Sequence, residues 1–266
     1  MQLNRKSVLS LTIFSAVLTL TFILSLSWAL IDYYRAAPEP IKTADTTTEE
    51  NTKKKEAMTI VALGDSLTRG TGDETGRGYV GLMSEMLKQE SNKEITIHNL
   101  GINGQRSADL MKQVEKQEIQ RQIGMADAIL ITIGGNDLFQ GGQTLMNIDP
   151  KEIDKAQNNY AANVQSILKT IRTKNSEAAV YLIGLYNPFI ELEDSQLTTR
   201  AVTEWNQRSA ELSAEFPRTI FVPTFDLFQL NINDYLFSDK FHPNKDGYKM
   251  IADRVTALLS RQEGVK

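Results

Sequence analysis

From residue 58 onward, short runs of apolar residues alternate with longer stretches in which apolar positions recur every three or four residues. The short runs are typical of buried parallel strands, and they lie at residues 59–63, 95–97, 128–133, 179–183 and 219–222. The longer stretches predict amphipathic helices, and they lie at residues 79–89, 153–172, 197–216 and 244–259. This alternation predicts an α/β fold with a parallel sheet that helices cover on both faces.

The N-terminal part has a different pattern. Residues 8–31 comprise 17 apolar residues and seven serines or threonines, without one charge. As a helix they would span about 36 Å, enough to cross a hydrocarbon core of about 30 Å. The length favours a transmembrane signal anchor, and the alternative is a signal peptide cleaved after Ala29. Because Arg5 and Lys6 precede the segment, residues 1–7 are predicted to be cytoplasmic and the rest of the chain extracytoplasmic.

The next stretch is polar and rich in charge. Residues 36–57 hold two prolines, nine charged residues of both signs, and Ile41 as the only large apolar residue. Such a composition buries too little surface to offset the entropy of ordering. We therefore predict a flexible extracytoplasmic linker over residues 32–57 and one folded domain over residues 58–266.

Composition narrows the chemistry of this domain. The chain has 29 basic and 33 acidic residues, so its net charge of −4 argues against a nucleic-acid partner. It has no cysteine, which excludes disulfides, thiolate metal sites and a cysteine nucleophile. It has only two histidines, His98 and His242, too few for a zinc site built from several histidines. We expect no metal and no organic cofactor.

The loops after the predicted strands carry the candidate chemistry, because parallel sheets bind ligands at the carboxyl ends of their strands. Loop 64–70 contains Ser66, whose hydroxyl becomes a nucleophile once a base accepts its proton. Loop 99–107 contains Gly101 and Gly104, and a glycine there could let a backbone N–H approach a substrate closely. Loop 134–137 contains Asn136, whose side chain could donate to an oxyanion. Taken singly, each loop is also compatible with an ordinary turn or helix cap.

A carboxylate and a histidine precede the last predicted helix. Asp239 and His242 are three residues apart, so both can face the same way in a turn. A carboxylate bonded to one ring nitrogen holds the tautomer whose other nitrogen can accept a proton. Pro243 keeps His242 outside the helix. His98 ends a predicted strand with no carboxylate nearby in the sequence, and we interpret it as structural.

Together these four loops resemble the SGNH hydrolase superfamily, also called the GDSL lipase/esterase family. The resemblance extends from residue 58 to about residue 260. The matching residues are Gly64-Asp65-Ser66-Leu67 in the first block, Asn99, Gly101 and Gly104 in the second, Gly134, Asn136 and Asp137 in the third, and Asp239, His242 and Pro243 in the last.

The resemblance implies a flavodoxin-like three-layer α/β/α sandwich with five parallel strands in the order 2-1-3-4-5. It implies that Ser66 is the nucleophile of an acyl-enzyme mechanism, that His242 is the general base and then acid, and that Asp239 orients His242. The implied oxyanion hole consists of the N–H groups of Ser66 and Gly101 and the side chain of Asn136. The remaining polar residues of these loops, Asp65, Arg69 and Asp137, are expected to hold the loops in place.

Five apolar residues follow the strand ends and either line an acyl pocket or pack within their loops. They are Leu138, Phe139, Tyr186, Phe189 and Phe237. We further expect residues 190–197 to form a flap beside the site, and Trp205 to belong to the core.

The sequence thus predicts a membrane-tethered, extracytoplasmic serine esterase or lipase whose substrate is an ester-containing small molecule, a lipid or a cell-surface glycan. Two alternatives stay open. The same framework can serve an acyltransferase or an O-deacetylase acting on a surface glycan, or a tethered binding module without activity.

Overall fold

The computed structural model describes residues 15, 18–28, 57–91, 93–140, 149–191 and 195–263. The chain divides into two units, Met1–Thr52 and Lys53–Lys266. In the first unit, residues 18–28 are helical and expose their large apolar side chains. Among the described residues, no helix is both long and apolar enough to cross a membrane. The remainder of the predicted anchor 8–31 and nearly all of the predicted linker 32–57 lie outside the described residues.

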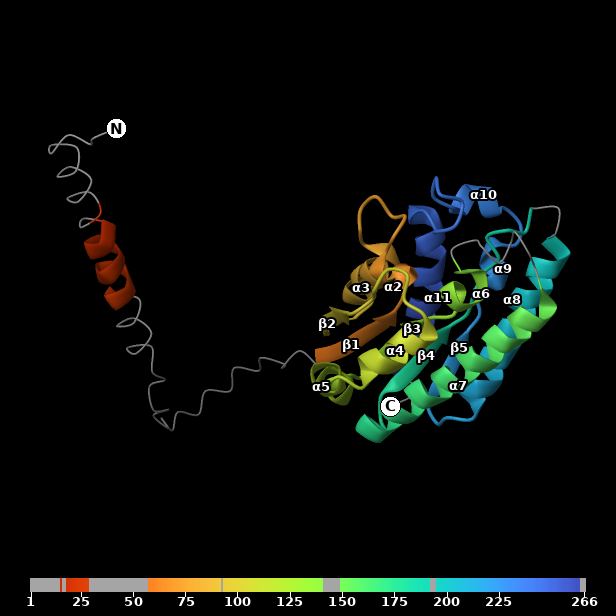
Figure 1. The fold of residues 1–266 in the computed structure, drawn as a ribbon, viewed down its shortest axis with the longest axis horizontal. Coiled ribbons are helices and arrows are strands. Elements are labelled where there is room, and N and C mark those ends of the chain that lie inside the picture. Colours follow the sequence, from red (N-terminus) through yellow and green to blue (C-terminus); the bar gives the residue numbers. More distant parts are fainter. Residues whose placement is uncertain are drawn as a thin grey trace, which may run out of the picture. The chain divides into compact units, whose positions relative to one another are not determined.

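The second unit is built on a five-stranded sheet (Figure 1). Its strands are β1 (Ala57–Gly64), β2 (Glu94–Asn99), β3 (Ala128–Thr132), β4 (Ala179–Ile183) and β5 (Thr219–Val222). All neighbouring pairs are parallel, and the order β2-β1-β3-β4-β5 confirms the predicted one. Each strand coincides with a predicted apolar run to within two residues.

Helices cover both faces of the sheet and complete the three layers. The side chains of Val61 and Leu63 point to one face and those of Ile60 and Ala62 to the other, because successive strand residues alternate. The first face packs against α4 (Ser107–Val114), α5 (Gln117–Met125), α7 (Pro150–Lys174) and α8 (Ser195–Ala214). The second packs against α3 (Gly78–Glu90), α9 (Phe225–Phe228), α10 (Ile232–Tyr235) and α11 (Lys245–Glu263).

The four long predicted helices correspond to α3, α7, α8 and α11. Helix α7 begins earlier than its apolar pattern does, because Asp149 caps it by accepting the N–H of Lys151 and Pro150 follows at the first helical position. Helices α4 and α5 had no specific prediction. In α5 only two residues, Ile119 and Ile123, are buried, and a pattern so brief does not stand out from a loop.

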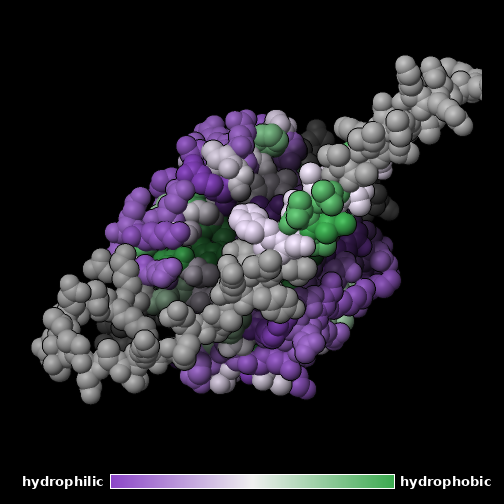
Figure 2. Space-filling model, turned by 90° about the vertical axis from the view of Figure 1, so that its left-hand side faces the viewer, coloured by the Kyte–Doolittle hydropathy of each residue, from purple (hydrophilic) through white to green (hydrophobic). Residues whose placement is uncertain are grey.

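Figure 2 shows a described surface that is mostly hydrophilic, apart from a hydrophobic cluster right of the centre of the view. Large apolar side chains that stay exposed in the second unit are scattered, at Ile102, Met125, Leu197 and Leu230. The apolar surface of this unit is therefore mostly buried in its two cores, one on each face of the sheet.

Candidate active site

Ser66 is placed by the abrupt turn at the end of β1. Gly64 has a φ of 128°, and a Cβ atom there would lie 2.0 Å from the carbonyl oxygen of Thr132, so only glycine lets the chain pass this close to β3. Asp65 then caps the short helix α2 (Ser66–Arg69) by accepting the N–H of Leu67 at 3.0 Å. As the first residue of α2, Ser66 lies at the carboxyl end of the sheet.

A buried polar network lies beside this turn. Asp65 accepts a hydrogen bond from the hydroxyl of Thr132 at 2.9 Å, and the hydroxyl of Thr68 lies 2.7 Å from that of Thr132 and 3.0 Å from that of Tyr79. Burial raises the pKa of Asp65 to about 6, against the opposing effect of the hydrogen bonds from Leu67 and Thr132. The network connects the Ser66 turn to β3 and α3. Asp65 thus stabilises its loop, as expected from the sequence.

Asp137 holds the neighbouring loop. Its carboxyl group accepts the N–H and the hydroxyl of Ser107, which joins the short helix α6 (Gly135–Phe139) to the start of α4. Burial raises the pKa of Asp137, although the hydrogen bonds from Ser107 lower it. Arg69 is exposed.

The turn before α11 brings a carboxylate and an imidazole to Ser66. Asp239 Oδ1 accepts the backbone N–H groups of Phe241 and His242, each at 3.0 Å, while Oδ2 lies 2.7 Å from Nδ1 of His242. Nε2 of His242 lies 2.9 Å from Oγ of Ser66. Burial raises the pKa of Asp239, but hydrogen bonds from the His242 ring and the two N–H groups outweigh it, and the pKa lies below its usual value. An ionised carboxylate so placed holds an imidazole in the orientation that accepts a hydroxyl proton.

The loop over residues 70–78 packs against His242. Gly72 has a φ of 95°, and a Cβ atom there would lie 2.9 Å from Cβ of His242 and 2.5 Å from the carbonyl oxygen of Pro243. From α11, the hydroxyl of Tyr248 donates to the carbonyl oxygen of Thr71 at 2.6 Å.

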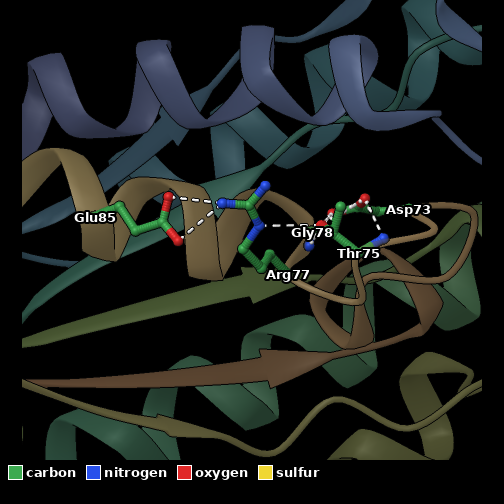
Figure 3. A network of polar contacts seen from close by, with 5 residues as sticks. All are labelled: Asp73, Thr75, Arg77, Gly78 and Glu85. Atoms are coloured by element: carbon green, nitrogen blue, oxygen red, sulfur yellow. Dashed lines mark hydrogen bonds and ion pairs between the residues drawn. The ribbon is translucent and has the colours of Figure 1, made fainter.

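A second network holds the far half of this loop (Figure 3). The carboxylate of Asp73 accepts the N–H and hydroxyl of Thr75 and the N–H of Gly78, all within 2.9 Å. Arg77 in turn donates to Thr75 and forms an ion pair with Glu85 on α3. The loop is thereby attached to α3 at one end and to the His242 turn at the other.

Asn136 and the loop after β2 supply candidate donors to an oxyanion. Asn136 donates one side-chain N–H to the carbonyl oxygen of Gln105 at 3.0 Å, which orients its amide group. Gly104 has a φ of 73° and lines a cavity together with Ser66, Asn136 and His242. Within the described residues, the backbone N–H groups of Ser66 and Gly104 donate to no partner.

The structure corrects the prediction for Gly101. Its N–H donates to Oδ1 of Asn99 at 3.1 Å, and it lines neither cavity at Ser66. A Cβ atom at Gly101 would lie 2.7 Å from the backbone nitrogen of Arg69, so this glycine allows two loops to pack closely. Both Gly101 and Gly104 were visible in the motif, but spacing alone does not tell which of them faces the serine.

Two cavities meet at Ser66 and Asn136. The first is narrow, with a volume of about 30 Å³, and most of its walls are apolar. The second is wide, with a volume of about 400 Å³, and polar side chains line much of it. His242 and Asp239 line the wide cavity and not the narrow one.

Three of the five predicted pocket residues line these cavities. Phe139 and Tyr186 line the narrow cavity and Phe189 lines the wide one. The other two predictions are corrected: Leu138 is buried in the core, and Phe237, whose backbone N–H donates to the carbonyl oxygen of His242, lines neither cavity.

Sequence reasoning missed Phe241, which lines both cavities. Its ring centroid lies 6.1 Å from that of Phe139 and 6.0 Å from that of Phe189. The sequence signal that could have indicated this role is the position of Phe241 between Asp239 and His242.

The remaining predictions have the following outcomes. His98 lies in β2 opposite Val61 and lines neither cavity, and Trp205 is fully buried in the core, as predicted. Residues 192–194 of the predicted flap lie outside the described residues. Among the described residues, no three His, Asp or Glu side chains gather in a group that could hold a metal ion.

The fold and the site define a hydrolase of the α/β class that acts on ester bonds. The chain belongs to the GDSL-like Lipase/Acylhydrolase family, whose model matches residues 62–250. The match spans all four sequence blocks that carry the resemblance, and it begins within β1 and ends within α11.

Two curated Bacillus proteins are similar to this chain. It is 32% identical over 216 residues to the uncharacterized protein YpmR of Bacillus subtilis strain 168, covering 79% of this chain and 85% of YpmR. It is 28% identical over 218 residues to the spore germination lipase LipC of Bacillus licheniformis, covering 78% of this chain and 99% of LipC.

Solved structures show the same fold. The lipase Lip_vut3 from a goat rumen metagenome superposes with a TM-score of 0.69 at 26% identity, covering 75% of this chain and 96% of that one. A catalytic mutant of Axe2, an acetylxylan esterase from Geobacillus stearothermophilus, superposes with a TM-score of 0.59 at 19% identity. The match covers 76% of this chain and 93% of that one. At that identity the second likeness concerns the fold alone.

Proposed function

We propose that this protein is a serine esterase that forms its acyl-enzyme on Ser66. The observation that carries the proposal is the unbroken line of contacts from the Asp239 carboxylate through the His242 ring to the Ser66 hydroxyl, at the junction of two cavities. Each group has the partner that its role requires.

In the proposed mechanism, Nε2 of His242 accepts the proton of Ser66 as Oγ attacks the ester carbonyl carbon. The oxyanion that forms accepts hydrogen bonds from the N–H groups of Ser66 and Gly104 and from the side chain of Asn136. His242 then gives the proton to the departing alcohol oxygen. A water molecule repeats the sequence on the acyl-enzyme, which releases the acid and restores Ser66.

We further propose that residues 8–31 tether the domain to the outer side of the cytoplasmic membrane. The absence of charge over these residues and the basic residues Arg5 and Lys6 before them support this topology. The apolar side chains that residues 18–28 expose would then contact lipid.

The test of the enzymatic proposal is hydrolysis of p-nitrophenyl acetate by the full chain and by Ser66→Ala. We expect kcat/KM to fall by about 10³-fold or more, because no other group replaces the nucleophile. Ser166→Ala removes an exposed hydroxyl of α7 and is the matched control, with unchanged activity. Circular dichroism checks that both variants stay folded. Retained hydrolysis in folded Ser66→Ala would place the nucleophile elsewhere.

A further inference from the structure

The two cavities at Ser66 have different relations to His242, and this difference assigns the two halves of an ester. Under the proposed function, the departing alcohol oxygen receives its proton from Nε2 of His242. That oxygen and the alcohol attached to it therefore lie on the side of Ser66 where His242 is found. His242 lines the wide cavity and not the narrow one, so the alcohol occupies the wide cavity and the acyl chain the narrow one.

The narrow cavity is small. Its volume of about 30 Å³ is less than a tenth of the 400 Å³ of the wide cavity. Of the two cavities, the narrow one therefore suits a short acyl group, such as acetyl or propionyl.

The walls of the narrow cavity are held in place by packing. Tyr186 stacks on Phe228 with ring centroids 4.3 Å apart, and its hydroxyl donates to the carbonyl oxygen of Phe241. Phe139 lies edge-on to Phe189 at 5.1 Å and is only 4% exposed. A long acyl chain would have to displace packed aromatic rings, and the cost of that displacement opposes its binding.

The wide cavity combines apolar surface with several polar side chains. Its lining includes Thr71, Asn103 and Gly104 as well as the site residues. The hydroxyl of Thr71 donates to Oδ1 of Asn103 at 2.9 Å, which fixes the direction of that amide. Within the described residues the two side-chain N–H groups of Asn103 donate to no partner, so both are available to hydroxyl oxygens of a ligand.

We infer that the substrate is a short-chain acyl ester, acetyl or propionyl, of an alcohol that carries several hydroxyl groups, such as an acetylated sugar. Phe139 and Tyr186 limit the acyl chain, and Asn103 with Thr71 contacts the alcohol. The inference rests on the proposed function, since it takes His242 as the group that protonates the alcohol.

The acyl half is tested with p-nitrophenyl acetate, butyrate and octanoate and the full chain. We expect kcat/KM for octanoate to be at least about tenfold below that for acetate. Phe139→Ala should raise the octanoate-to-acetate ratio by about tenfold, because it opens the wall. Leu138→Ala is the matched control, since it removes a buried side chain of the same short helix that lines neither cavity. The ratio is measured within one protein, so a partly unfolded sample does not change it.

The alcohol half is tested by comparing 6-O-acetylglucose with p-nitrophenyl acetate, which share the acyl group. Asn103→Ala should raise KM for the sugar ester at least about fivefold more than KM for p-nitrophenyl acetate, because only the sugar ester loses hydrogen bonds to the Asn103 amide. Asn158→Ala, on the exposed face of α7, should leave KM unchanged for both substrates.

The outcomes separate the inference from the proposed function. Hydrolysis that depends on Ser66 but is fastest with octanoate would overturn the short acyl chain and leave the esterase intact. An equal effect of Asn103→Ala on both acetates would overturn the assignment of the alcohol. Hydrolysis that persists in Ser66→Ala would overturn the proposed function itself, and the inference with it.

Discussion

At the scale of the single residue, Asp65 combines a charge-bearing group with nearly complete burial. Its pKa of about 6 lies roughly two units above that of an unfolded chain, so the folded protein retains a proton that the unfolded chain has lost. The stability that this group contributes is fully present below about pH 4 and is lost as the pH rises through 6. Two units correspond to about 3 kcal/mol of unfolding free energy.

We therefore predict that Asp65→Asn abolishes most of the fall in unfolding free energy that occurs as the pH rises through 6. Oδ1 of Asp65 accepts both the N–H of Leu67 and the hydroxyl of Thr132, and an amide oxygen can accept the same two hydrogen bonds, so the turn is preserved while the titration disappears. The measurement is the free energy of unfolding in urea at pH 4.5 and pH 7. Asp109→Asn on the surface of α4 is the control. If the loss of stability between pH 4.5 and pH 7 is unchanged in Asp65→Asn, another group causes it.

At the scale of the element, the loop over residues 70–78 couples the His242 turn to α3. It contacts His242 through Gly72 and is held at its other end by Asp73, Arg77 and Glu85 (Figure 3). Four glycines of this loop adopt positive φ, and two of them, Gly72 and Gly76, have φ values of 95° and 67°. Of these two, only Gly72 has neighbours within 4 Å of the position that a Cβ atom would take. Substitutions at Gly72 and Gly76 therefore distinguish the effect of backbone strain from the effect of contact with His242.

We predict that Gly72→Ala and Gly76→Ala each cost about 1–3 kcal/mol of stability through backbone strain. Only Gly72→Ala should also lower kcat, by about 10²-fold, because its methyl group displaces His242 from Ser66. Steady-state kinetics on p-nitrophenyl acetate, with thermal melting of both variants, provides the comparison. Equal kcat values in the two variants would mean that the loop does not position His242.

At the scale of the whole molecule, we propose that the apolar segment 8–31 sets where the ester hydrolase domain acts. We predict that the full chain sediments with membranes, that high salt does not release it, and that its N-terminal sequence begins before Leu30. External protease should digest the domain in intact cells stripped of their wall. A soluble product that begins at Leu30 would instead indicate a cleaved signal peptide, and a protected domain would reverse the topology.

The sequence by itself determined the elements and much of the site. Buried parallel strands are continuous apolar runs and long helices are periodic ones, so both patterns are visible in one dimension, and the motifs supplied the strand order. Asp239 and His242 are three residues apart, so a local turn is enough to bring them together. Ser66 and Asn136 follow strand ends directly, and the parallel sheet places such residues at one edge.

Only the tertiary structure decided which groups meet across long stretches of chain. It placed Gly104 rather than Gly101 beside Ser66, because the choice depends on how the loop after β2 packs on the turn after β1. It also determined the volumes of the two cavities and the place of Phe241 in their walls. Cavity volume results from how the loops after β3 and β4 pack against the turn before α11. Periodicity reports which face of an element is buried, whereas the space left between elements depends on the three-dimensional fit of side chains distant in sequence.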